Sequence, residues 1–343
     1  MKKVTTIGFD LAKNVFQVHG VDASGETVIR RQLRRRQVIP FFRDLASCLI
    51  GIEACATSHH WARTLQGLGH EVRIMPANYV KAYVKRNKND AADAQAICEA
   101  VTRPNMRFVA VKTAEQQSLM MLHRTRSLLV RQHTMVVNAI RAHMAEFGIV
   151  APVGRRGMAA LLSVISDHQD DRLPAVARLC LESLVVALTT VEREAASNER
   201  CIHAWHRSSE TSRRLETIPG IGPIIATALL ASVSDPSLFK SGRELAAWIG
   251  LVPKQNSSGG KERLGRISKQ GDPYLRWLLV AGAMSVIRQG RKTGFANNPW
   301  LADLMQRKPT KVAAVALANR NARTAWAVLV SGETYRRPAV TGA

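Results

Sequence analysis

The sequence has few acidic residues for its length. Its 343 residues contain 26 Asp and Glu against 49 Lys and Arg, which gives a formal net charge of +23. Such an excess of one sign repels itself unless a polyanion is near, and nucleic acid is the usual one, because each neutralised phosphate releases counterions. The charge therefore favours a nucleic-acid partner. An ordinary basic protein, or one that meets acidic membranes, is the alternative.

Cysteine is also scarce, and its spacing argues against two kinds of site. The number is odd and no CxxC pair occurs, so neither a disulfide framework nor a zinc site is expected, and a reducing cytoplasm fits. The start of the chain lacks the apolar run of a signal peptide, and no stretch is apolar enough to span a membrane. The five cysteines are Cys48, Cys55, Cys98, Cys180 and Cys201.

What is present suits a soluble globular protein of two or three domains. Apolar residues make up 46% of the chain and charged residues 22%, which is not the composition of a disordered protein. The patterns described below divide the chain into residues 1–110, 111–212 and 213–343. We expect an α/β domain first, a long helical arm second and a helical domain last.

Strands and helices alternate in the first domain. Short apolar runs predict strands over 4–9, 15–21, 27–33, 48–52 and 72–75. Helices are predicted over 38–46, from an N-cap at Ser58 to Leu68, after Pro76, and over 90–101. Three hairpin-linked strands followed by helix, strand, helix, strand and helix is the element order of the ribonuclease H-like fold.

Four carboxylates are candidates for a metal site. Asp10 and Glu53 each end a predicted strand, and Asp90 and Asp93 share one face of the last helix. Strands one and four are neighbours in a ribonuclease H-like sheet, so the four would converge there. Carboxylate oxygens suit Mg²⁺, with Mn²⁺ as a substitute, and two ions about 4 Å apart can support phosphoryl transfer. Taken singly, each acid is equally an ordinary surface charge or a helix cap.

The middle of the chain is helical. Residues 113–147 contain no helix breaker, and two apolar series recur every seven residues: Leu122, Leu129 and Val136, and Met121, Leu128 and Met135. A second helical region covers about 174–205. We predict an antiparallel coiled-coil arm over 111–212 that also serves oligomerisation, with an ordinary helical bundle as the alternative.

The last region opens with a turn that has the shape of a helix–hairpin–helix. In the segment Ile218–Ile224, Gly220 and Gly222 would let the backbone approach a phosphate, and the next helix would present free N–H groups to it. A plain glycine-rich turn is the alternative. Helices are expected over about 274–288 and 311–330.

Polar and basic segments supply further candidate phosphate contacts. Residues 254–261 are polar and glycine-rich and predict a phosphate-binding or surface loop, which continues through Arg263, Arg266 and Lys269. Two basic groups lie in the first domain, and for the first of them a solvated face is the alternative. They are Arg30, Arg31, Arg34, Arg35 and Arg36, and then Lys81, Lys85, Arg86 and Lys88 just before Asp90.

These motifs together resemble the DEDD transposases of bacterial insertion sequences. The group is the family numbered one hundred and ten with its eleven-hundred-and-eleven branch, and it includes the Piv invertase. The resemblance covers nearly the whole chain. It is carried by the segments 8–13, 51–54, 87–94, 218–222, 250–253 and 257–259.

The resemblance implies a mechanism that the residues alone do not. Asp10, Glu53, Asp90 and Asp93 match the acidic tetrad of a RuvC-like domain that supplies Mg²⁺. Ser258, with Ser257 beside it, matches a serine that attacks DNA and forms a phosphoserine link. Such a hydroxyl needs activation by a metal or carboxylate.

The same resemblance names nucleic-acid contacts and partners. Family members look like multimers, here a dimer or tetramer, in which tetrad and serine meet across subunits. They use a noncoding bridge RNA that pairs with donor and target DNA. The nucleic-acid contacts expected here are Lys85, Arg86, Lys88, Gly220, Gly222, Lys261, Arg263, Arg266 and Lys269.

Three other functions remain to be compared with the serine recombinase. In a RuvC-like nuclease the tetrad would activate water and the serine would be structural. A sugar-kinase-like or actin-like ATPase shares the fold core, but it needs a glycine-rich phosphate hairpin after the first acidic strand, and residues 10–14 have none. A DNA-binding structural protein would leave the four acids unexplained.

Overall fold

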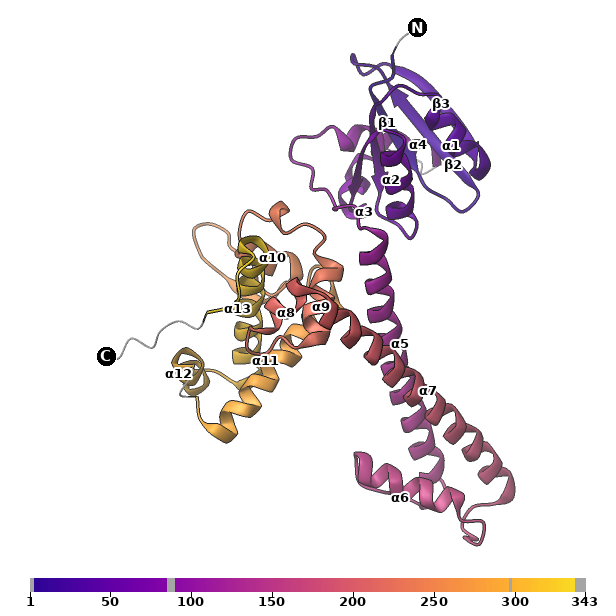
Figure 1. The fold of residues 1–343 in the computed structure, drawn as a ribbon, viewed down its shortest axis with the longest axis vertical. Helices are drawn as coiled ribbons and strands as arrows, with labels where there is room; N and C mark the ends of the chain where they lie inside the picture. Colours follow the sequence, from indigo (N-terminus) through magenta and orange to yellow (C-terminus); the bar gives the residue numbers. More distant parts are fainter. Residues whose placement is uncertain (1–2, 85–89, 296–297, 337–343) are drawn as a thin grey trace. The chain divides into compact units, whose positions relative to one another are not determined.

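The chain folds into two compact units, Met1–Glu115 and Gln116–Ala343 (Figure 1). The computed structural model describes residues 3–84, 90–295 and 298–336. Within those ranges, no helix has the length and apolar character needed to cross a bilayer.

The N-terminal unit is built on one five-stranded sheet of order β3-β2-β1-β4-β5. The first three strands are antiparallel neighbours, whereas β1, β4 and β5 run parallel. The predicted adjacency of the first and fourth strands is therefore confirmed, and the mixed sheet is consistent with a ribonuclease H-like domain. The strands are β1 (Thr6–Asp10), β2 (Val15–Val21), β3 (Thr27–Arg34), β4 (Leu49–Glu53) and β5 (Glu71–Met75).

Helices follow the strands in the predicted order, with two local corrections. The first helix begins at Arg35, three residues earlier than predicted, because the side chain of Gln37 accepts the N–H of Arg34 at 2.8 Å. Ser58 is the first helical residue and not the N-cap, and its hydroxyl donates to the carbonyl of Cys55 at 2.9 Å. The helices are α1 (Arg35–Arg43), α2 (Ser58–Gly67), α3 (Ala77–Val80), the 3₁₀ turn η1 (Lys81–Tyr83) and α4 (Asp90–Val101).

The two faces of this sheet are covered differently. On one face aromatic rings fill the space toward α1 and α2: Phe9 packs edge-on against Phe42 at 5.0 Å and stacks with Phe16 at 5.5 Å between ring centroids. Gly8 and Gly51, which point the opposite way along the strands, lie directly against α4. The helix that carries Asp90 and Asp93 is thus seated on the two central parallel strands.

Two long helices begin the C-terminal unit. Helices α5 (Ala114–Ala145) and α7 (Ala175–Ser208) run antiparallel, because Arg126 pairs with Glu199 at 2.7 Å and His133 with Glu192 at 3.1 Å. Helix α6 (Arg155–Ser166), which the sequence patterns missed, packs into the apolar cluster between them (Figure 1).

Only one of the two seven-residue series on α5 is partly buried. Leu122 and Val136 pack against apolar clusters of this unit. Met121, Leu128 and Met135 are 66%, 43% and 63% exposed, so the part of the chain that the structure describes covers one side of the apolar stripe and leaves this row open.

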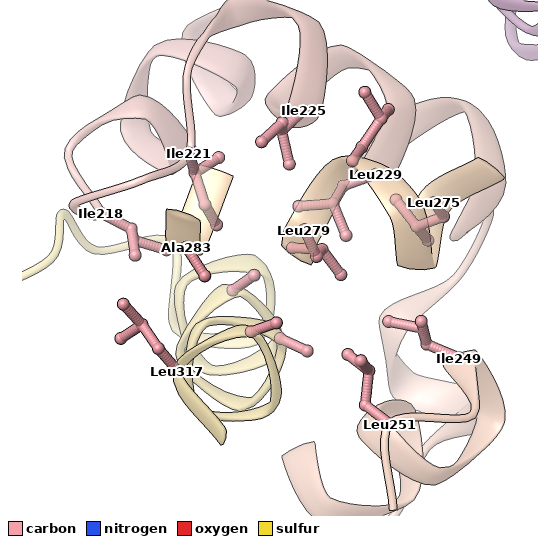
Figure 2. Close-up of a cluster of buried hydrophobic side chains, with 14 of the residues drawn as sticks. Ile218, Ile221, Ile225, Leu229, Ile249, Leu251, Leu275, Leu279, Ala283 and Leu317 are labelled. Atoms are coloured by element: carbon pink, nitrogen blue, oxygen red, sulfur yellow. The ribbon is translucent and has the colours of Figure 1, made fainter. Parts of the chain in front are cut away.

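The rest of the C-terminal unit is a helical domain around α13 (Thr310–Ser331). One face of α13 is buried and rich in alanine, and the side chains of α9 and α11 close over it (Figure 2). The predicted polar surface loop over 254–261 is exposed and forms the tip of a β-hairpin, with its first two residues in a strand. The other elements are α8 (Glu210–Glu216), α9 (Pro223–Ser232), the 3₁₀ turn η2 (Pro236–Leu238), α10 (Gly242–Ile249), β6 (Pro253–Gln255), β7 (Leu264–Ile267), α11 (Pro273–Thr293) and α12 (Pro299–Arg307).

Candidate active site

Asp10 and Glu53 lie side by side at the C-terminal ends of two neighbouring inner strands of the sheet. They are the last residues of β1 and β4, and the pair before them, Phe9 and Ile52, is in register. Because side chains alternate along a strand, both carboxylates lie on the same face as Gly8 and Gly51, the face that α4 covers. Both residues are half-buried.

The two glycines set the distance between α4 and the sheet. A Cβ on Gly8 would lie 2.0 Å from the carbonyl oxygen of Ala94, and one on Gly51 would lie 2.8 Å from the Cβ of Val101. Such contacts are far shorter than van der Waals separation, so only glycine allows the helix to approach this closely. Each glycine stands two residues before a carboxylate, a signal that could have been recognised in the sequence.

The direction of α4 brings its N-terminus to the carboxylates. The thiol of Cys98 donates to the carbonyl of Thr6 at 3.7 Å, whereas Ala94 lies beside Gly8, so α4 runs opposite to β1. Asp90 is one turn before Ala94, about 6 Å along the helix. Asp10 is two residues beyond Gly8, about 7 Å along the strand. The start of α4 is therefore level with the end of β1.

The structure describes three of the four predicted carboxylate side chains. Asp93 is half-buried on α4, one turn before Ile97, which a side chain on Gly51 would touch. The side chain of Asp90 lies outside the described residues, as do Lys85, Arg86 and Lys88, while Lys81 is exposed in η1. The described side chains by themselves form no group of three that could hold a metal ion. The donors here are carboxylate oxygens, which is the set that Mg²⁺ prefers.

The predicted nucleophile lies on the hairpin of the C-terminal unit. Gly259 and Gly260 have φ values of +57° and +75° and form a two-residue turn between Ser258 and Lys261, which are paired across it. The N–H of Lys261 donates to the carbonyl of Ser258 at 3.1 Å. Both serines, Lys261 and Arg263 are exposed, so two hydroxyls and two cations lie near the tip of the hairpin.

The two adjacent serines differ in their contacts. The hydroxyl oxygen of Ser257 accepts the N–H of Arg263 at 3.2 Å, which ties this side chain to the opposite strand. No side-chain hydrogen bond of Ser258 occurs among the described residues. Of the two, Ser258 has the hydroxyl that is not used to hold the hairpin together.

The base of the hairpin is held firmly by backbone packing. A Cβ on Gly250 would lie 2.2 Å from the carbonyl oxygen of Gln270, and one on Gly271 would lie 2.0 Å from that of Trp248. The guanidinium of Arg276 donates to the carbonyls of Ile249 and Gln270, each at 2.9 Å. Lys269, at the same junction, has a φ of +55°, a strained conformation for a residue with a side chain.

The predicted helix–hairpin–helix turn joins α8 to α9, and its two glycines differ. A Cβ on Gly220 would lie 2.9 Å from Val286 Cγ2, and Asn321 Nδ2 donates to the carbonyl of Pro219 at 2.9 Å. This part of the turn is therefore packed against α11 and α13. A Cβ on Gly222 would meet nothing within 4 Å, so only this glycine faces open space.

A buried histidine anchors α5 to the helical domain. The ring of His123 is bound by the hydroxyls of Tyr274 at 3.1 Å and Thr227 at 3.0 Å. Burial, with a smaller contribution from Arg126, lowers the pKa of His123 to about 4. The imidazole is therefore neutral at physiological pH.

Comparison with known proteins places the chain among transposases. A DEDD transposase model, described as "Transposase", matches residues 7–149, and the model described as "Transposase IS116/IS110/IS902 family" matches residues 212–301. The chain belongs to this IS116/IS110/IS902 family of insertion-sequence transposases, as its resemblance indicated.

Relatives match over almost the whole chain. A probable family 20 transposase of Pseudomonas aeruginosa is 50% identical, with 98% of this chain and 99% of the relative covered. The transposase for insertion sequence element IS1111A of Coxiella burnetii is 38% identical, with 98% and 92% covered. The transposase for element IS1328 of Yersinia enterocolitica is 37% identical, with 98% and 100% covered.

Proposed function

We propose that the protein cuts and rejoins DNA at the ends of an insertion sequence through a covalent link between Ser258 and DNA. The observation that carries the proposal is the placement of Ser258. It is exposed on a glycine turn with Lys261 and Arg263, and the base of its hairpin is fixed by packing. A nucleophile on a rigid support, with cations beside it, suits attack on a phosphodiester.

The chemical step is a transesterification. The hydroxyl oxygen of Ser258 bonds to the scissile phosphorus while the bond from phosphorus to the leaving deoxyribose oxygen breaks. The hydroxyl proton passes to a base, and the leaving oxygen takes up a proton. Lys261 and Arg263 neutralise charge on the phosphate. The covalent link conserves one phosphodiester bond for rejoining, so no external energy source is required.

Asp10, Glu53, Asp90 and Asp93 would hold Mg²⁺, or Mn²⁺ in its place. The support is the level placement of Asp10 and Glu53 on neighbouring strands, and the close seat of α4 on Gly8 and Gly51. When bound, the metal would neutralise phosphate charge and lower the pKa of a nucleophile. The carboxylates themselves bind and orient it.

Two partners complete the proposal. DNA and a noncoding guide RNA encoded beside the gene would together neutralise the +23 charge of the chain. A charge of this size suits binding of more than one nucleic-acid strand. A dimer or tetramer would cover the exposed row of Met121, Leu128 and Met135 on α5. The protein would act on DNA in the bacterial cytoplasm.

A denaturing gel tests the covalent link. Purified protein is mixed with the adjacent RNA, DNA carrying the element ends, and Mg²⁺, and then denatured. We expect a DNA-linked protein band that disappears in Ser258→Ala and Asp10→Asn. Ser257→Ala, one residue away, and Asp44→Asn, an exposed acid of the same unit, serve as matched controls and keep the band.

A different pattern would favour the hydrolytic alternative. DNA cleavage that yields no band and continues in Ser258→Ala, but stops in Asp10→Asn, would mean a RuvC-like nuclease that uses water. A band that is lost in Ser257→Ala and kept in Ser258→Ala would move the nucleophile by one residue.

A further inference from the structure

A long groove lies in the C-terminal unit, between the serine hairpin and α13. It has a volume of about 1620 Å³. One wall is the hairpin, through Gly265 and Arg266 of β7, and the other is α13 together with Trp300 and Tyr335. Of the residues that line this groove, Arg266 and Lys269 are phosphate contacts predicted from the sequence, and Leu251 and Pro253 lie in the motif segment 250–253.

The wall formed by α13 is one stripe of that helix. Val312, Val315, Asn319, Arg323 and Ala327 follow one another at intervals of three or four residues and all line the groove. From the first to the last they span about 22 Å at the helical rise. This is the face of α13 opposite to its buried alanines, and on it Val312, Arg323 and Ala327 are exposed.

The charge of the groove is of one sign. Among the described residues that line it there is no Asp or Glu. Arg336 has a partner outside the lining, Glu333, at 3.9 Å. A groove that collects cations and holds no acid complements a polyanion. The cations that line it are Arg266, Lys269, Lys311, Arg320, Arg323 and Arg336.

Aromatic groups distinguish this groove from a plain phosphate-binding surface. The guanidinium of Arg320 lies over the ring of Trp300 at 4.9 Å from its centroid, and Trp300 is 37% exposed. Tyr335 is held at the same end, because its N–H donates to the hydroxyl of Thr217 at 2.9 Å. Aromatic rings beside a row of basic residues bind nucleobases by stacking on them. The faces of the bases are accessible for such stacking in an unpaired strand but not inside a double helix.

A second cavity adjoins this aromatic end. It has a volume of about 600 Å³ and shares Trp300, Arg320 and Tyr335 with the groove. Its lining adds the amides of Gln289 and Asn298, groups that can hydrogen-bond to base edges. A double helix hides those edges within base pairs, whereas a single strand presents them.

We propose that this groove binds an unpaired single strand of nucleic acid, with its phosphates along Arg266, Lys311 and Arg323 and one base stacked on Trp300. The α13 stripe is long enough to follow several successive phosphates of a single strand. Because β7 continues into the loop of Ser258, a strand in the groove lies along the base of the hairpin that carries the nucleophile. That last point rests on the proposed function, but binding itself does not.

Fluorescence anisotropy of the full-length protein tests the site. The probes are labelled single-stranded DNA and RNA of mixed sequence and a DNA duplex of the same length, without Mg²⁺. We expect Trp300→Leu to weaken single-strand binding about ten-fold, as loss of one stacked base does, and to leave duplex binding within two-fold. Trp277→Leu, at a tryptophan that is 54% exposed and lies outside the groove, should change neither.

The charges are tested by salt dependence. Lys311→Gln combined with Arg323→Gln should lower the slope of log affinity against log salt by about 1.4, since each single-strand phosphate contact contributes about 0.7. Arg193→Gln combined with Arg200→Gln removes the same charge from exposed positions on α7 and should leave the slope unchanged.

The outcomes separate this proposal from the proposed function. Ser258→Ala should bind the single strand as the unaltered protein does. If the unaltered protein binds the single strand but forms no covalent band, only the serine chemistry is overturned. Tighter binding of the DNA or the RNA probe identifies which strand occupies the groove. Wild-type single-strand affinity in Trp300→Leu, or an equal loss for duplex, would overturn the groove proposal and favour a duplex or protein occupant.

Discussion

Replacing Gly8 by alanine is the sharpest test of how the N-terminal unit positions its carboxylates. The added Cβ would lie 2.0 Å from the carbonyl oxygen of Ala94, and ordinary contact begins near 3.4 Å. The helix α4 must therefore withdraw by about 3.4 − 2.0 = 1.4 Å, since the nearest atom is backbone and cannot rotate away. Overpacking of this kind costs about 1–3 kcal/mol of stability, and we expect a value near 3 kcal/mol.

The withdrawal should impair catalysis more than it impairs folding. Asp93 is carried by α4, whereas Asp10 and Glu53 are carried by the sheet, so the change separates the two halves of the carboxylate set. A displacement of about 1 Å can slow a positioned reaction about hundred-fold. The covalent band should therefore form much more slowly, and added Mg²⁺ should restore part of the rate.

Two measurements check this reasoning. Hydrogen exchange of amides in β1 and β4 reports the stability of this unit, and the gel assay reports activity. Gly67→Ala is the matched control: a Cβ there meets nothing within 4 Å on α2, so it should be neutral or stabilise by up to about 1 kcal/mol. If Gly8→Ala exchanged and reacted like the unaltered protein, α4 would not depend on this seat, and the placement of Asp93 would need another explanation.

Two further predictions concern the C-terminal unit, whose unfolding in urea can be followed by fluorescence because five of the six tryptophans lie in it. Folding lowers the pKa of His123 from 6.5 to about 4, so as the pH falls the unfolded chain takes up this proton at a higher pH than the folded protein does. The stability that depends on neutral His123 is fully present above about pH 6.5 and is lost progressively as the pH falls toward 4. We expect a loss of about 2 kcal/mol between pH 7.5 and 5. It should disappear in His123→Gln and persist in His133→Gln, and an unchanged slope in His123→Gln would assign the acid sensitivity elsewhere. Asn321→Leu should destabilise by about 1–3 kcal/mol at all pH values, because it removes the donor to the Pro219 carbonyl; a wild-type urea midpoint would show that this bond contributes little.

Much of the N-terminal unit could be predicted because its signals are local. Five short apolar runs separated by turns gave the strands, and an acid at the end of two of them gave Asp10 and Glu53. Helix starts were predicted less well. Arg35 begins α1 because the side chain of Gln37 accepts the N–H of Arg34, and such a cap depends on the turn before it as well as on the residues.

Two features of the C-terminal unit, the hairpin strands and the groove, could not be predicted from the sequence, each for a different reason. The hairpin strands β6 and β7 are only three and four residues long and almost wholly exposed, so no alternation of apolar and polar residues marks them. Gly259-Gly260 is the local hint of the turn. The groove arises where Arg266, Trp300 and Arg323 meet from three different elements. No pattern along the chain can predict such a meeting before the fold is known.

The alanines of α13 have a consequence for how this protein can change. Ala313, Ala314, Ala318, Ala322 and Ala325 have no rotamers to lose on burial, and their small size lets neighbouring helices approach closely. Enlarging any of them would overpack the core, whereas the exposed side chains of Val312, Arg323 and Ala327 on the opposite face bear no such restriction. One helix thus has a buried side that does not tolerate larger residues and an exposed side that does. A change of nucleic-acid preference could be selected, or engineered, on the exposed side without altering the fold.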